Sequence, residues 1–225
     1  ALGAAEGAAE ALESTPAPVR ERGPWDVDEV EERGARVDLG ALWIPGRDGM
    51  ELRMELDQNS GIVTAAAVTL AGSTLQMQVF AAPRSEGIWD GIRAEIAESV
   101  TQQGGSVDDL PGPFGRELLV RLPVRTEDGR TGSRPARFIG HDGPRWFLRG
   151  VLTGRAAVDP QEAAALEGLF ADVVVLRGTD ARVPRELIAL TMPEARGPAV
   201  TGLPPAGGRP AFDPLERGPE ITEVH

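Results

Sequence analysis

Few residues in this sequence could carry out acid–base chemistry near neutral pH. His141 is the one histidine inside the chain, so a serine hydrolase or a histidine general base would have to use it. It lies in a His-Asp-Gly-Pro turn between two predicted strands, where Asp142 is expected to cap its own backbone, and no Gly-x-Ser-x-Gly sequence accompanies it. Adjacent carboxylates such as Asp108 and Asp109 point to opposite sides of an extended chain, so we interpret them as solvated charges. The sequence therefore favours a protein without catalytic activity.

Three residue types are absent from the chain: lysine, cysteine and tyrosine. Without lysine there is no Schiff base and no phosphate-loop lysine, and without cysteine there is no thiol nucleophile, disulfide or thiolate metal site. The two histidines, His141 and His225, are too few for a multi-histidine metal site. We expect no cofactor and no bound metal.

Arginine supplies all 23 basic residues of the chain. Together with 28 glycines, 19 prolines and a single asparagine, this composition is typical of a very GC-rich genome. Arginine is therefore informative only where its placement is unusual. Residues 116–155 are such a place, because they hold nine arginines against four acidic residues in a chain whose net charge is -12.

Two arginine pairs in that region form the candidate ligand site. Arg121 and Arg125 share one face of a predicted strand, and Arg145 and Arg149 share one face of another. If the two strands are neighbours, these guanidinium groups would bind the carboxylate or phosphate of a small anionic ligand such as a nucleotide, with His141 or Asp142 as the nearby acid–base group. The alternative is that the arginines pair with the protein's own acidic residues, and the sequence leaves both open.

The acidic net charge argues against a nucleic acid or an anionic membrane as a partner, because both require a basic surface. No stretch reaches the roughly 18 apolar residues of a membrane span. The first residues, ALGAAEGAAEALE, have neither the basic region nor the apolar core of a signal peptide. We expect a cytoplasmic protein.

The first half of the folded region predicts four strands and a helix. Stretches of apolar or alternating residues separated by short turns predict a meander whose strands cover residues 37–45, 50–58, 62–70 and 74–83. The apolar period then lengthens, which predicts a helix that is capped by Ser85 and ends at Gly104 and Gly105. The apolar residues of this helix are Ile88, Trp89, Ile92, Ile96 and Val100.

The second half predicts further strands and one short helix. The predicted strands cover residues 117–125, 134–141, 145–153 and 172–176. Asp159 as a cap and Pro160 at the first helical position predict the start of the short helix before the last strand. This order is typical of an α+β domain, which we expect to have a mainly antiparallel sheet with its helices on one face. Trp89 and Trp146 follow the apolar periodicity of their elements, so both are expected in the core.

The two ends of the chain lack the composition of a folded core. The predicted organisation is an acidic flexible arm, an α+β domain and a Pro/Gly-rich flexible tail, covering residues 1–36, 37–178 and 179–225. The arm holds nine acidic residues and a single aromatic residue, Trp25. Trp25 either covers an edge of its own domain or, together with Val27 and Val30, binds a protein partner.

Five segments of the sequence form a pattern that resembles a known family. They are RVDLGAL (36–42), FAAPRSEGIWD (80–90), TQQGG (101–105), GPFG (112–115) and GPRWFLRGVLT (143–153). On these segments, the region from about residue 23 to residue 177 resembles an actinobacterial domain of unknown function, DUF3710. This resemblance supplies neither a known activity nor known catalytic residues. More loosely, the order of the elements resembles the PsbP-like fold, whose members are mostly non-enzymatic accessory or binding proteins.

Two hypotheses for function follow. The first is a non-catalytic cytoplasmic module that binds a protein partner or assembles into a homo-oligomer. The second is a binding protein or enzyme that holds a small anionic ligand on an arginine-lined sheet face.

Overall fold

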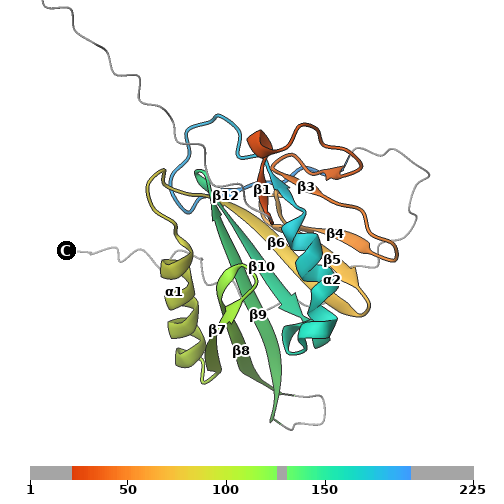
Figure 1. Cartoon of the computed structure of the whole chain (residues 1–225). Helices are drawn as coiled ribbons and strands as arrows, with labels where there is room; N and C mark the ends of the chain where they lie inside the picture. The colour runs from red at the N-terminus through yellow and green to blue at the C-terminus, as the bar shows by residue number, and fades with distance from the viewer. Residues whose placement is uncertain (1–21, 126–130, 194–225) are drawn as a thin grey trace, which may run out of the picture.

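A computed structural model of the protein describes residues 22–125 and 131–193. Within these residues the chain forms two β-sheets, two α-helices and two short 3-10 helices (Figure 1). All strand pairs but one are antiparallel. The predicted α+β class and the mainly antiparallel sheet are therefore confirmed.

Among the described residues, the larger sheet contains eight strands. Seven of them lie side by side in the order β4 (Glu51–Leu56), β5 (Val63–Leu70), β6 (Ser73–Ala81), β10 (Trp146–Thr153), β9 (Thr131–Gly143), β8 (Gly115–Arg125) and β7 (Ser106–Gly112). The eighth, β12 (Leu187–Ile188), pairs with β6 beyond the residues that β5 occupies. Two successive meanders, β4 to β6 and β7 to β10, are thus joined by the pairing of β10 with β6.

The smaller sheet contains four short strands. Their order is β1 (Trp25–Asp26), β11 (Val174–Val175), β3 (Leu42–Ile44) and β2 (Val37–Asp38), with β1 parallel to β11. The prediction of one meander strand over residues 37–45 is wrong, because this segment divides into β2 and β3 and pairs with itself. Gly40 makes the turn at φ +76°, and its N–H donates to Asp38 Oδ1 at 2.9 Å.

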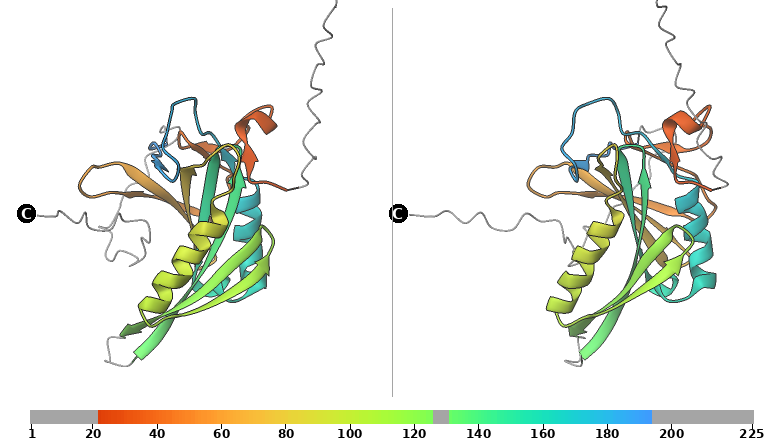
Figure 2. Two further views of the ribbon diagram at one scale, coloured as in Figure 1. Left: turned by 90° about the vertical axis from the view of Figure 1, so that its left-hand side faces the viewer. Right: turned by 60° about the vertical axis from the view of Figure 1, so that its left-hand side comes forward.

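α1 (Trp89–Gln102) and α2 (Pro160–Ala171) lie on opposite faces of the larger sheet (Figure 2). Successive residues of β10 show why: Phe147 packs with α1, whereas Trp146 and Leu148 pack on the side of α2. The prediction that both helices share one face is therefore wrong. A strand with apolar residues at consecutive positions is covered on both faces.

Each helix covers a separate hydrophobic core. The core under α1 includes Phe80, Trp89, Ile92, Ile96, Val100, Leu118, Val120, Phe138 and Phe147. The core under α2 and the smaller sheet includes Leu42, Ile44, Met77, Trp146, Leu148, Leu166, Leu169 and Phe170. Trp89 and Trp146 are 5% and 0% exposed, so the prediction that both are core residues is confirmed, with one in each core. Full burial of such side chains contributes about 1.5–3 kcal/mol each.

α2 begins as predicted. The Asp159 side chain accepts the Gln161 N–H at 2.9 Å, and Pro160 is the first helical residue. The strand predicted after this helix is β11, which belongs to the smaller sheet. The end of α2 is thereby connected directly to the region where the two sheets meet.

α1 is capped from a distant part of the chain. The predicted cap Ser85 is wrong, since the helix is preceded by Ile88, which makes no capping bond of its own. Instead the carboxylate of Asp142, the second-last residue of β9, accepts hydrogen bonds from the N–H groups of Ile88 and Trp89 at 2.8 and 3.2 Å. Asp142 therefore caps α1 rather than its own backbone, and a carboxylate at a helix N-terminus also favours the helix dipole.

Both predicted flanks contribute to the folded domain. The Trp25 N–H donates to the Val173 carbonyl at 2.9 Å. Asp26 is buried and accepts the Trp146 Nε1–H at 2.5 Å. In the other flank, β12 pairs with β6. The predicted domain boundaries thus fall inside the folded region, and the parts of the flanks that lie outside the described residues are 1–21 and 194–225.

Candidate functional site

The arginines predicted to line one sheet face do not come together. β9 lies between β8 and β10, so the strands that carry Arg121 and Arg149 are not neighbours. Arg121 is on the α2 side of the sheet and pairs with Asp108 of β7 at 2.6 Å. Arg149 is on the α1 side, is 2% exposed, hydrogen-bonds Gln78 and lies 5.5 Å from the centre of the Phe80 ring. The condition for a shared arginine face is therefore not met.

The remaining predicted ligand residues lie at two ends of the sheet. Arg145 makes the β9–β10 turn at φ +65°, and its carbonyl accepts the Arg177 Nε–H at 3.1 Å. His141, near the same turn, has its ring 5.9 Å from the Trp146 ring. Arg125 ends β8 opposite the first residue of β9, and its side chain lies outside the described residues. The length of β9 therefore separates Arg125 from His141.

The predicted partner-binding residues lie in and after β1. Trp25, Val27 and Val30 are all half-buried. The 3-10 helix η1 (Val27–Glu29) follows β1 and is held by a capping box in which Glu29 accepts the Asp26 N–H at 2.7 Å. Acidic residues of the predicted arm thus stabilise η1 directly after the first strand of the smaller sheet.

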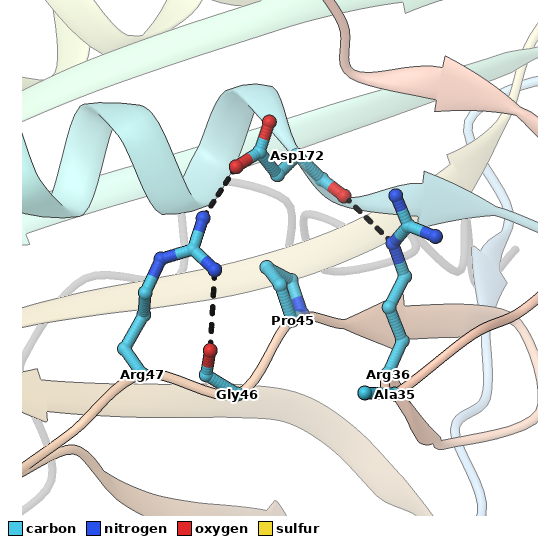
Figure 3. A pocket seen from close by; sticks show the side chains of 6 residues that line it. All are labelled: Ala35, Arg36, Pro45, Gly46, Arg47 and Asp172. Carbon is cyan, nitrogen blue, oxygen red and sulfur yellow. Dashed lines mark hydrogen bonds and ion pairs between the residues drawn. The ribbon is translucent and has the colours of Figure 1, made fainter.

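An open hollow lies at one end of the smaller sheet. It has a volume of about 350 Å³, and we call it the Arg36–Arg47 hollow; its lining residues are Ala35, Arg36, Pro45, Gly46, Arg47 and Asp172 (Figure 3). Arg36 precedes β2, Arg47 follows β3, and Asp172 precedes β11. Because β3 is antiparallel to both β2 and β11, these three positions meet at the same end of the sheet.

Backbone carbonyls orient both guanidinium groups of the hollow. Arg36 donates from Nε to the Asp172 carbonyl and from Nη1 to the Arg33 carbonyl, each at 3.1 Å. Arg47 donates from Nη1 to the Gly46 carbonyl at 3.1 Å and from Nη2 to the Asp172 carboxylate (Figure 3). The two side chains are thus directed by separate segments toward one space.

The charges of the hollow suit an anion. The lining holds two guanidinium groups and one carboxylate, which leaves a net positive charge in a chain that is acidic overall. The side chains of Arg47 and Asp172 are 38% and 50% exposed, so their ion pair is a weak surface pair. A carboxylate or phosphate from outside could replace Asp172 at Arg47 at low cost and accept hydrogen bonds from the arginine forks.

Sequence reasoning does not identify Arg36 or Arg47. Arg47 falls in a predicted turn, and Arg36 is the last residue of the predicted arm, so neither stands out among 23 arginines. Arg36 and Asp172 are 136 positions apart, and no local pattern links them. The one available signal is that the two arginines lie at either end of one short apolar segment, residues 37–45.

A second charged cluster is buried beneath α2. Arg137, 7% exposed, pairs with Glu117 at 3.0 Å and with Glu167 of α2 at 2.6 Å. It also donates to the Ala156 carbonyl of the 3-10 helix η2 (Gly154–Ala157) at 3.3 Å. Burial raises the pKa of Glu117, and Arg137 opposes that rise. Because this cluster joins β8, β9, η2 and α2 inside the core, we interpret it as structural.

Among residues 22–125 and 131–193, no three histidine, cysteine, aspartate or glutamate side chains are placed to hold a metal ion. In the same residues, neither helix has the length and apolar character needed to cross a membrane. The Arg36–Arg47 hollow, with two arginines and one carboxylate, is suited to an anion rather than to a cation.

Comparison with known proteins identifies a family. A family model described as "Protein of unknown function (DUF3710)" matches residues 23–198. The match includes β1 and every residue that lines the Arg36–Arg47 hollow. No curated protein was found to match the chain.

Proposed function

The chain belongs to the DUF3710 family, whose function is unknown. We propose, from the residues on the surface of this chain, that it is a non-catalytic, cytoplasmic protein-binding module. In this proposal the Arg36–Arg47 hollow receives an acidic group of a partner protein. One observation carries the proposal: two guanidinium groups from separate segments are oriented by backbone carbonyls around one open space.

The openness of the hollow favours a protein over a small molecule. Sites for small ligands usually enclose most of the ligand surface and are lined mainly by apolar side chains. The Arg36–Arg47 hollow is open and lies at a sheet end, with charged and backbone groups prominent in its lining. An acidic side chain on a larger surface would be held there while the rest of its protein contacts the surroundings.

The alternative of a small anionic ligand on an arginine-lined sheet face has less support. Arg121 and Arg149 lie on opposite faces of the larger sheet, and each is engaged by neighbouring side chains. A small anion in the Arg36–Arg47 hollow is instead one outcome of the test below.

Titration with a defined acidic probe tests the proposal. Hexaglutamate peptide is added to the ¹⁵N-labelled full chain while the arginine Nε–Hε resonances are followed by NMR. We expect saturable shifts confined to Arg36 and Arg47. Changing both to glutamine should weaken binding by about tenfold or more, because hydrogen bonds to charged groups are lost. Asp172→Asn should strengthen binding, because it removes the competing carboxylate.

Arg155→Gln is the matched control, because Arg155 is an exposed arginine paired with Glu162 on another part of the surface. It should leave the affinity for hexaglutamate unchanged. Equal weakening by Arg155→Gln, or shifts spread over all exposed arginines, would overturn the proposal. Citrate that binds Arg36 and Arg47 more tightly than the peptide would overturn the assignment of a protein partner and favour a small anion.

A further inference from the structure

The larger sheet ends in two edges of different character. At one end, β7 carries Pro111 and the adjacent Asp108 and Asp109, and it packs beside α1. A proline in an edge strand is a common means of preventing that edge from pairing with another strand. At the other end, β4 has no proline, and among the described residues it pairs with β5 on one side and with no strand on the other. Its register with β5 shifts between Glu55 and Leu56, so the regular part of the edge is Glu51–Glu55. Figure 2 shows the β4–β5 hairpin, in orange, extending away from both helices. The β4 edge is therefore the one open to pairing.

The side chains of β4 alternate between a charged face and an apolar face. Arg53 and Glu55 share the first face, and Leu52, Met54 and Leu56 share the second. Leu52 and Met54 are half-buried against the α2 core, whereas Leu56 is 52% exposed. From Leu52 to Leu56 the sequence is apolar, arginine, apolar, glutamate, apolar. This pattern is complementary to itself when it is reversed about Met54.

We propose that two copies of this chain associate by antiparallel pairing of their β4 edges, centred on Met54. In a continuous sheet, residues opposite one another project from the same face. This register places Arg53 opposite the partner subunit's Glu55, and Glu55 opposite the partner subunit's Arg53. It also places the exposed Leu56 opposite the partner subunit's Leu52, and Met54 opposite its own copy.

Other registers are less favourable. Centring the pair on Arg53 would set Arg53 against Arg53 and Glu51 against Glu55, and like charges directly opposite are destabilising. Centring it on Leu52 would pair only the first residues of each strand and leave Leu56 outside the interface. Charge order thus disfavours the Arg53 register, and the length of paired strand disfavours the Leu52 register. In the Met54 register the pair of like charges, Glu51 with Asp57, lies at the end of the paired region, where Asp57 is already outside β4. One register is therefore favoured, which is how an edge can pair specifically without general aggregation.

The existing contacts of the charged residues permit this pairing. Arg53 pairs with Glu51 of its own strand at 3.2 Å, with both side chains more than half exposed, so Arg53 can turn outward at little cost. Glu55 accepts the Gln76 amide at 2.5 Å, and a carboxylate can accept further donors. An interface of this length is small, so the dimer is expected to dissociate on dilution through the micromolar range. The β4 edge shares no residue with the lining of the Arg36–Arg47 hollow, so either proposal can fail without the other.

Sedimentation velocity on the full chain tests the proposal, over concentrations from about 1 to about 200 µM, the range in which a small interface should dissociate. The wild type should change from monomer to dimer as concentration rises. Arg53→Glu should weaken the dimer by about tenfold or more, because the introduced carboxylate then lies opposite Glu55 of the other copy. The double variant Arg53→Glu with Glu55→Arg should restore the dimer, because it exchanges the charges and keeps each pair opposite in sign.

Two controls separate pairing from folding and from net charge. Arg155→Glu makes the same change of charge at an exposed position outside β4 and should leave the dimer intact. Thermal unfolding of each variant checks that the monomer is folded. A wild type that stays monomeric throughout, a dimer unaffected by Arg53→Glu, or a double variant that is not restored would each overturn the proposal. Restoration is specific to the Met54 register, because pairing centred on Leu52 would set the introduced carboxylate against Glu51.

Discussion

The arginines of the larger sheet and those of the Arg36–Arg47 hollow carry the same group in different surroundings. Arg137 is 7% exposed between two glutamates, and Arg149 is 2% exposed beside an aromatic ring, so both belong to the fold. Arg36 and Arg47 are oriented by backbone carbonyls beside open space. The solvent exposure and orientation of the guanidinium groups, rather than the local number of arginines, therefore distinguish a candidate binding site from a structural network.

The largest effect is expected from removing a buried arginine. Arg137→Ala would leave Glu117 and Glu167 without their shared cation inside the core. Breaking a buried ion pair in this way costs about 3–5 kcal/mol of unfolding free energy. Urea unfolding measures the loss, with Arg155→Ala as an exposed control that should stay within about 0.5 kcal/mol. Equal stability of the two variants would show that Arg137 is not structural.

The same network predicts a dependence of stability on pH. Burial raises the pKa of Glu117 above its ordinary value, so the folded state binds this proton more tightly than the unfolded state does. Ionised Glu117 therefore lowers the free energy of unfolding at neutral pH. This loss is removed as the pH falls from the raised pKa of Glu117 in the folded state to its lower pKa in the unfolded state. The wild type should gain stability relative to Glu117→Gln over that range, as measured by urea unfolding at a series of pH values. A difference in unfolding free energy between the wild type and Glu117→Gln that does not change with pH would contradict a raised pKa of Glu117.

An exposed carboxylate can also belong to the fold. Asp142→Ala removes the cap of α1 and should lower the unfolding free energy by about 1 kcal/mol. Ser85→Ala, at the cap position expected from the sequence, makes no such bond in α1 and should change stability by less than about 0.5 kcal/mol. Thermal and urea unfolding compare the two variants. A larger loss of unfolding free energy for Ser85→Ala than for Asp142→Ala would show that Ser85, and not Asp142, caps α1.

Periodic patterns account for the elements that can be predicted from the sequence. The alternation of β6, the apolar spacing of α1, the Asp159–Pro160 start of α2 and the burial of both Trp89 and Trp146 depend on neighbours within a few positions. Strands of two residues such as β1 and β11 are too short to show a period. β7, with the sequence SVDDLPG, does not alternate and contains a proline, so the sequence does not predict it.

The candidate site could not be predicted because it depends on contacts between distant segments. The pairing of β10 with β6 and the placement of β9 between β8 and β10 decide which arginines meet, and neither follows from local spacing. Asp142 and Ile88, the residue before α1, are 54 positions apart. The residues of the Arg36–Arg47 hollow come from three segments that only the smaller sheet brings together.

The smallest effect on stability, together with the largest effect on binding, is expected when Arg36 and Arg47 are both changed to glutamine. The decisive measurement is the affinity of this double variant for hexaglutamate by NMR titration, with its unfolding free energy measured in parallel. We predict binding weaker by about tenfold or more and stability within about 0.5 kcal/mol of the wild type. Unchanged affinity in a stably folded double variant would contradict the claim that these two arginines form the binding site.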